Sequence, residues 1–140
     1  MVALLADDVL GAGREAGEDM VPYLAAYDAM QAEGGNHLIL GEIDGRVVAT
    51  YQLTFITGLS RRASRRAQVE SVRVVSDLRG QGIGAQLMAD AEARALAAGC
   101  SLIQLTTQRT RLDAHRFYDR LGYEPSHFGY KKALAAEHRA

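Results

Sequence analysis

The pattern of hydrophobic and polar residues predicts a β-hairpin over residues 37–56. Two apolar runs, residues 37–43 and residues 46–56, are separated only by Asp44 and Gly45. An Asp-Gly pair favours the tight two-residue turn that joins antiparallel strands. We therefore expect two strands that pair with each other across this turn.

The residues after the hairpin predict a loop and then a further strand. Residues 57–66 are polar and basic, which is typical of an exposed loop. Four arginines lie in or at the end of this loop: Arg61, Arg62, Arg65 and Arg66. An apolar, β-branched run over residues 69–75 follows and predicts a strand.

Apolar residues recur at helical spacing in three other segments. The first, residues 20–32, has Asp19 as a candidate N-cap and Pro22 in its first turn, where proline is tolerated. The second runs from about residue 82 to residue 98, and the third covers residues 112–121. A glycine follows the second and the third, as is common at helix ends.

The remaining segments complete a mixed α/β order. Residues 101–107 predict a buried strand, and one or two short final strands are expected around Pro125. Residues 3–11 predict a short additional helix. The order of helices and strands predicts an α/β fold in which a mixed sheet is flanked by helices.

Composition limits the class of protein. A chain of 140 residues predicts one domain, residues 1–140, with a substantial core. It has no apolar run of membrane-spanning length and no signal peptide, so we expect a cytoplasmic protein that does not act on a membrane. The single Cys100 excludes an internal disulfide, and no cluster of His, Cys, Asp and Glu has metal-ligand spacing, so no metal is expected.

Charge is unevenly distributed along the chain. Residues 1–45 contain nine acidic residues and one arginine, whereas residues 46–140 contain eight acidic and fifteen basic residues. The basic part suits an anionic ligand. Because the net charge is only −1 and no recognition motif is present, nucleic acid is not an expected partner.

A glycine-rich turn joins the strand at residues 69–75 to the helix that follows it. Gly80, Gly82 and Gly84 are spaced by two residues, and Arg79 precedes them. The first N–H groups of a helix lack partners within the helix and attract anions, above all phosphate. The stretch is neither a Walker P-loop nor a dinucleotide fingerprint, because the required Lys and third glycine are missing. A turn that needs glycine only for packing is the alternative.

Two motifs resemble those of the GNAT superfamily of N-acetyltransferases, which bind acetyl-coenzyme A. The pattern Arg79-x-x-Gly82-x-Gly84 resembles the pyrophosphate-binding motif of that superfamily. Residues 114–123, AHRFYDRLGY, resemble its later segment A-x-x-F/L-Y-x-x-x-G-F/Y. The two occur in the family's order and spacing, and the resemblance extends over residues 36–134.

The resemblance implies a twisted mixed sheet in which the fourth and fifth strands of the family splay apart. These strands correspond to residues 69–75 and 101–107, and acetyl-coenzyme A would enter between them. The backbone amide of Val72 would face the thioester oxygen, and Val74 would pair with the pantetheine arm. The pyrophosphate would be wrapped by Arg79, Gly80, Gln81, Gly82, Ile83 and Gly84.

The resemblance also implies two catalytic residues. An acceptor amine must lose a proton before it attacks, and Glu70 lies where family members place the general base. Gln68 occupies another family base position but cannot itself act as a base. Tyr118 would donate a proton to the departing thiolate. In the alternative interpretation, Glu70 binds substrate or pairs with an arginine, and Tyr118 is a core tyrosine.

The function implied is an acetyl-coenzyme A-dependent N-acetyltransferase that moves the acetyl group to a primary amine of a small molecule or peptide. The amine would attack the thioester directly, since Cys100 lies at the wrong end of its strand to carry the acyl group. A non-catalytic acyl-coenzyme A sensor of the same fold is the alternative. The acidic first third hints at a cationic acceptor, whereas the arginine loop could hold an anionic substrate or the 3′-phosphate of the coenzyme.

Two positions depart from the family pattern. Arg111 stands where many members have an asparagine that contacts the pantetheine arm. The chain also has hardly any room before residues 3–11 for the family's first strand, which could be absent, supplied by another subunit or lost to a wrong start site. A homodimer is consistent with family habit.

Overall fold

A computed structural model describes residues 19–135 of the chain. The chain divides after Leu105 into two compact units, which are described separately. The helix expected at residues 3–11 lies outside the described residues. Within residues 19–135, no helix combines the length and the apolar character that crossing a membrane requires.

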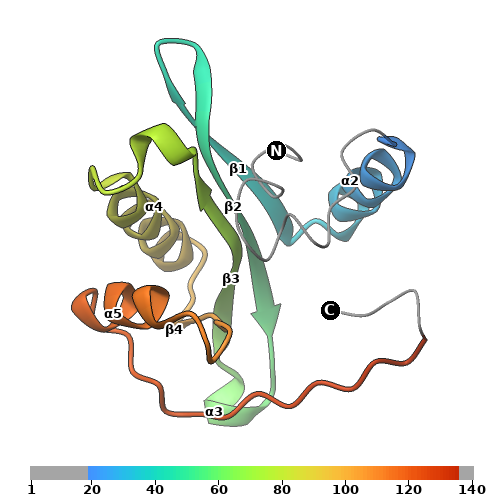
Figure 1. Cartoon of the computed structure of the whole chain (residues 1–140). Coiled ribbons are helices and arrows are strands. Elements are labelled where there is room, and N and C mark those ends of the chain that lie inside the picture. Colours follow the sequence, from blue (N-terminus) through green and yellow to red (C-terminus); the bar gives the residue numbers. More distant parts are fainter. Residues whose placement is uncertain (1–18, 136–140) are drawn as a thin grey trace. The chain divides into compact units, whose positions relative to one another are not determined.

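The first unit is built on a four-stranded sheet (Figure 1), and its mixed strand directions are as the sequence predicts. Its strands follow one another in chain order: β1 (Asn36–Ile43), β2 (Arg46–Thr57), β3 (Arg65–Val74) and β4 (Leu102–Gln104). β1, β2 and β3 are antiparallel, whereas β4 pairs with β3 in the parallel direction.

The turns between these strands depend on left-handed backbone conformations. Asp44 and Gly45 have φ values of 50° and 79°, which confirms the tight hairpin turn between β1 and β2. The connection from β2 to β3 contains α3 (Ser60–Ala63), a single turn whose last three residues all have positive φ. Because Arg65 and Arg66 still pair with β2, β3 begins four residues earlier than the sequence predicts.

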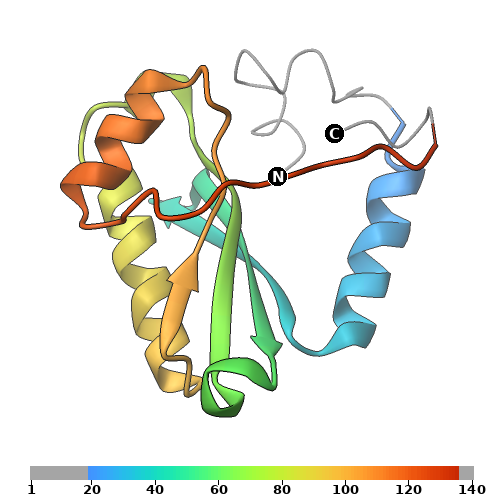
Figure 2. The ribbon, with the colours of Figure 1, turned by 90° about the horizontal axis from the view of Figure 1, so that it is seen from below.

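Helix α4 (Ile83–Ala97) covers one face of this sheet and forms the core with it. Side chains alternate between the two faces of a strand, and the buried residues of β2 and β3 on the α4 side are predominantly apolar. Figure 2 shows α4 running alongside β3 and β4. The residues that pack here are at most 2% exposed: Tyr51, Leu53, Ala67, Val69, Met88 and Ala91.

Helix α2 (Val21–Glu33) contacts β1 and confirms the first predicted helix. The Val21 N–H donates to the Asp19 carboxylate at 3.0 Å, but Met20 is the N-cap residue and its side chain makes no capping bond, so the prediction of Asp19 as N-cap is wrong by one position. None of the residues of α2 is buried. Cys100 is buried after α4.

The second unit contains helix α5 (Leu112–Arg120), which confirms the third predicted helix. The prediction of one or two final strands around Pro125 is wrong, because residues 121–135 form no strand. Phe128, Tyr130 and Leu134 are 85–94% exposed, so no neighbouring strand buries their side chains. The prediction rests on apolar residues alone. A strand also needs a pairing partner, and this segment has none among the described residues.

Candidate functional site

A β-bulge interrupts β3 at the position where the thioester contact is predicted. Opposite β2, Arg73 pairs with Thr50 and Glu70 pairs with Gln52, so Ser71 and Val72 together face one residue of β2. Ser71 has a φ of 56°, a conformation that non-glycine residues rarely adopt. A bulge of this kind re-aims backbone groups out of the ladder.

β3 and β4 remain paired over only three residues. Arg66, Ala67 and Gln68 pair with Leu102, Ile103 and Gln104. β3 then continues to Val74, whereas β4 ends. The strand predicted over residues 101–107 is therefore shorter than expected, because the two strands part after Gln104.

The glycine turn lies between β3 and α4 and is open to solvent. Gly80 and Gly82 have φ values of 79° and 84°, which glycine adopts readily. A Cβ atom at either position would have no neighbour within 4 Å. The turn therefore leaves space for a ligand to approach its backbone.

The N-terminus of α4 has no side-chain cap. Its first helical hydrogen bond runs from the Gln86 N–H to the Gly82 carbonyl at 3.2 Å. The N–H groups of Ile83, Gly84 and Ala85 thus have no carbonyl partner within the helix. With the helix dipole, they favour a bound anion such as pyrophosphate.

Two arginines set the charge near this turn. Arg46 donates two hydrogen bonds of 3.1 Å to Asp77, and this contact lowers the pKa of the Asp77 carboxyl. The negative charge beside the turn is therefore balanced. The Nε of Arg79 donates to the Val74 carbonyl at 3.2 Å, which holds the side chain at the end of β3.

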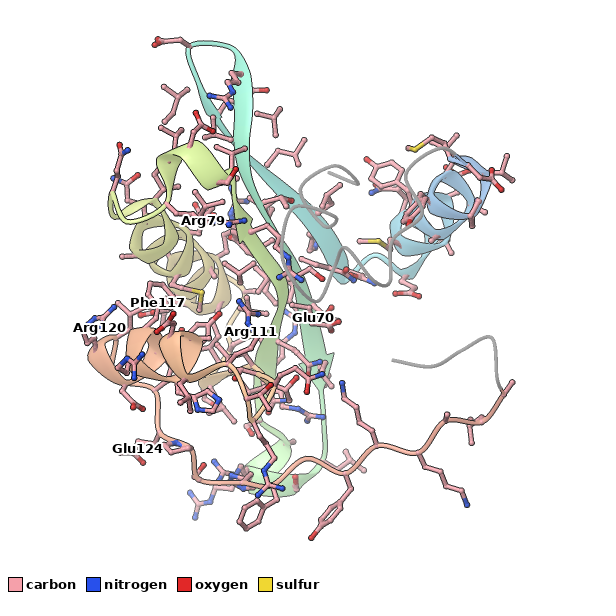
Figure 3. All side chains as sticks on the ribbon, viewed as in Figure 1. Glu70, Arg79, Arg111, Phe117, Arg120 and Glu124 are labelled. Carbon is pink, nitrogen blue, oxygen red and sulfur yellow. The ribbon has the colours of Figure 1, made fainter. Side chains whose placement is uncertain are left out.

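Glu70 lies farther along β3, on the face opposite α4 (Figure 3). Its carboxylate is exposed and accepts a hydrogen bond of 3.0 Å from the Nε2 of Gln68. Gln68 in turn accepts a bond of 2.9 Å from the Nε2 of Gln104. Glu70 makes no ion pair with an arginine within residues 19–135.

Gln104 is a residue of this site that the sequence did not single out. It lies on β4 directly opposite Gln68 of β3. The available signal was a polar residue inside an otherwise buried-looking strand. Its significance depends on strand pairing, which the sequence alone does not fix.

Tyr118 belongs to α5 in the second unit. Its ring is half-buried and makes edge contacts with Phe117 and Tyr123, with centroid separations of 5.0 and 5.8 Å. Arg111, which replaces the family's asparagine, is the exposed N-cap residue of this helix. Tyr118 and Glu70 thus belong to different compact units of the chain.

Histidine, cysteine and carboxylate side chains do not cluster in the described part of the chain. Residues 19–135 contain no group of three or more His, Cys, Asp or Glu side chains that could hold a metal ion. His115 instead contacts the Gln108 carbonyl at 2.8 Å, consistent with a packing role. His127 lies 2.7 Å from the Ser126 hydroxyl.

Comparison with known proteins identifies the class. The family model described as "Acetyltransferase (GNAT) family" matches residues 5–123, so the chain belongs to this family. Membership confirms the resemblance that the two motifs carry. It also implies acetyl-coenzyme A as the donor, and the open glycine turn with its uncapped helix fits that group.

One curated relative matches part of the chain closely. The aminoalkylphosphonate N-acetyltransferase of Salmonella typhimurium strain LT2 is 49% identical over 67 residues, which are 48% of this chain and 44% of that protein. The match thus spans less than half of this curated relative.

Solved structures match over nearly the whole chain. A transcriptional regulator from Bacillus halodurans C-125 is 45% identical, with a TM-score of 0.91 over 96% of this chain and 91% of the other. A protein from Agrobacterium tumefaciens strain C58, provisionally described as an acetyltransferase, is 26% identical, with a TM-score of 0.81 over 93% and 90%. These matches confirm the predicted mixed sheet with flanking helices.

Proposed function

We propose that this chain transfers the acetyl group of acetyl-coenzyme A to the primary amine of a small molecule or peptide. One observation carries the proposal. Strand β3 holds a carboxylate at Glu70 and a bulge at Ser71 and Val72, and an open glycine turn follows after the short 3-10 helix η2 (Ser76–Leu78). The proposed base, the thioester contact and the pyrophosphate site thus follow one another along the chain.

The coenzyme would lie along the part of β3 that β4 leaves unpaired. Its pyrophosphate would meet the backbone N–H groups at the start of α4. Val74 would pair with the pantetheine arm, and the Val72 N–H would face the thioester oxygen. The residues proposed to hold the pyrophosphate are Arg79, Gly80, Gln81, Gly82, Ile83 and Gly84.

The reaction would begin when Glu70 removes a proton from the ammonium group, directly or through water. The free amine then attacks the thioester carbon, and the new C–N bond forms as the carbonyl oxygen becomes an oxyanion. The Val72 N–H would stabilise this oxyanion. When the C–S bond breaks, Tyr118 would give a proton to the thiolate, and the second proton of the former amine nitrogen would pass to the Tyr118 phenolate, directly or through water, leaving a neutral amide. Cys100 is buried, which favours direct attack over an acyl-enzyme intermediate.

The acceptor is the least constrained part of the proposal. The relative from Salmonella typhimurium is named for acetylation of aminoalkylphosphonates, so these small primary amines are the first acceptors to test. Neutral amines and polyamines test the opposite charge preference, which the acidic first third of the chain favours.

A second candidate function is acyl-coenzyme A sensing without turnover. The similar protein from Bacillus halodurans is described as a transcriptional regulator, although it shares this fold. A sensor would bind the coenzyme at the same turn but would acetylate no amine. Fold similarity alone does not separate the two functions.

Calorimetric titration with acetyl-coenzyme A, followed by a thiol-release assay with an amine library, tests the proposal. We expect saturable binding and release of coenzyme A that depends on the added amine. Binding without release for any amine would favour the sensor. Absence of binding at millimolar coenzyme would contradict both functions.

A further inference from the structure

We propose that Gln68 and Gln104 are positioning residues that hold the Glu70 carboxylate in its reactive orientation. This inference rests on the proposed function, in which Glu70 is the general base. Two consecutive hydrogen bonds carry it: Gln104 donates to Gln68 at 2.9 Å, and Gln68 donates to Glu70 at 3.0 Å. We refer to these three residues as the amide relay.

The chemistry of the groups fixes the direction of the relay. An ionised carboxylate only accepts hydrogen bonds, so Gln68 must present its NH2 group to Glu70. The carbonyl oxygen of Gln68 is then left facing Gln104, which must present its own NH2 group. Gln104 therefore determines which end of the Gln68 amide faces the base.

The relay crosses the sheet where β3 and β4 part. Gln68 and Gln104 are the last residues paired between the two strands. Both are half-buried, whereas Glu70 is exposed. Two anchored amides thus restrain a carboxylate that would otherwise be free to change rotamer.

The position matches the proposed chemistry. Glu70 directly precedes the bulge at Ser71 and Val72, where the thioester is proposed to lie. General-base catalysis requires the base to be within hydrogen-bond reach of the proton that it removes. A base held toward Gln68 is presented to an amine on the polar face of the sheet, opposite the core that α4 covers.

A neighbouring amide offers a matched control. Gln52 lies opposite Glu70 on the same face, but its NH2 group donates to the Asn36 side chain at 2.9 Å. It shares the chemistry and partial burial of Gln68 and Gln104 without a hydrogen bond to the base. Any loss of kcat on substitution of Gln52 therefore measures a general disturbance of this face of the sheet.

Three substitutions of Gln104 test the relay by steady-state kinetics with the full chain. Gln104→Met keeps the shape and removes the donor, and we expect kcat to fall by about tenfold because the base is no longer held. Gln104→Glu places a second acceptor beside Gln68 and lowers kcat further. Gln104→Lys supplies a donor again and restores kcat to within about threefold of wild type. The KM for acetyl-coenzyme A stays within about twofold throughout, as does kcat of Gln52→Met.

A double-mutant comparison identifies the route of the effect. In a Glu70→Gln background, Gln104→Met should cause no further loss of kcat, because the relay acts only through the base. An equal loss in both backgrounds would overturn the proposal, as would equal rates for Gln104→Met and Gln104→Lys. Thermal unfolding of each variant separates these results from loss of folding.

The failure of the relay and the failure of the proposed function give different results. If the wild-type protein acetylates an amine but Gln104→Met is as active, the relay is overturned and the transferase stands. If the wild type binds acetyl-coenzyme A and acetylates no amine, the transferase is overturned and the positioning role with it.

Discussion

The buried hydroxyl of Tyr51 links the sheet to α4. Tyr51 is completely buried and donates to the Asp90 carboxylate at 2.5 Å, and Arg94 donates to the same carboxylate at 2.8 Å. Burial, and then the bond to Asp90, raises the pKa of Tyr51. Desolvation would raise the pKa of Asp90, but the bonds from Tyr51 and Arg94 outweigh it and lower that pKa.

Replacing this tyrosine should lower stability in a pH-dependent way. At neutral pH, Tyr51→Phe removes a bond to a charged group and should reduce the free energy of unfolding by about 1.5–3 kcal/mol. The raised pKa means that the unfolded chain loses the Tyr51 proton first, above about pH 10, so wild-type stability falls there. The difference between the two proteins should therefore shrink as pH rises above 10. Urea unfolding from pH 7 to 11 measures it, and a constant difference would contradict the role of this hydroxyl.

Removing the hydroxyl of Tyr118 distinguishes a chemical role of this residue from a packing role. If its hydroxyl protonates the thiolate, Tyr118→Phe should lower kcat by about 100-fold and leave the dissociation constant of acetyl-coenzyme A unchanged. Its aromatic neighbour Tyr123 provides the control, because Tyr123→Phe removes a hydroxyl from the same cluster. Equal losses of turnover and coenzyme affinity in Tyr118→Phe would indicate packing instead. Calorimetry and thiol release supply the two measurements.

At the scale of the elements, the glycine turn gives a prediction with a built-in control. Gly82 and Gly99 flank α4, have φ values of 84° and 80°, and have open space where a Cβ would lie. Alanine at either position should therefore cost about 1–2 kcal/mol of stability through backbone strain. Only Gly82→Ala should also weaken coenzyme A binding, by tenfold or more, because only that methyl group meets the proposed pyrophosphate. Equal affinities for the two variants, measured calorimetrically, would place the pyrophosphate elsewhere.

The elements that could be predicted from the sequence are those that local signals define. The Asp44-Gly45 turn and the glycines after α4 and α5 mark hairpin and helix ends directly. The bulge at Ser71 and the short pairing of β4 depend on contacts between distant strands, and no local pattern reports them. The failed strands after α5 show the same limit, because strand formation needs a partner.

Polar side-chain contacts, in the core and in the candidate site, divide along the same line. Spacing within one helix predicts the pair Asp90 and Arg94, but Tyr51 joins it from 39 residues away. Glu70 was predicted from its place on the strand that corresponds to the fourth strand of the family. Gln104 lies 36 residues from Gln68, and only the pairing of β3 with β4 brings the two amides together.

At the scale of the whole molecule, the question is whether the two compact units act as one domain. The chain divides after Leu105, yet the family match runs from residue 5 to residue 123 and crosses this boundary. The proposed reaction also draws Glu70 from one unit and Tyr118 from the other. The expectation of a single domain, residues 1–140, therefore has a measurable consequence for unfolding.

We expect the whole chain to unfold in one cooperative transition that acetyl-coenzyme A shifts as a unit. A ligand that binds only the folded state at 100 times its dissociation constant adds about 2.7 kcal/mol of stability. For a chain of this size, that raises the midpoint temperature by roughly 5–10 °C. Calorimetry with and without the coenzyme measures the shift, and Gly82→Ala at the same coenzyme concentration should show a smaller one. Two transitions, of which the coenzyme moves only the one that contains the glycine turn, would show that the units unfold independently and would contradict a single domain.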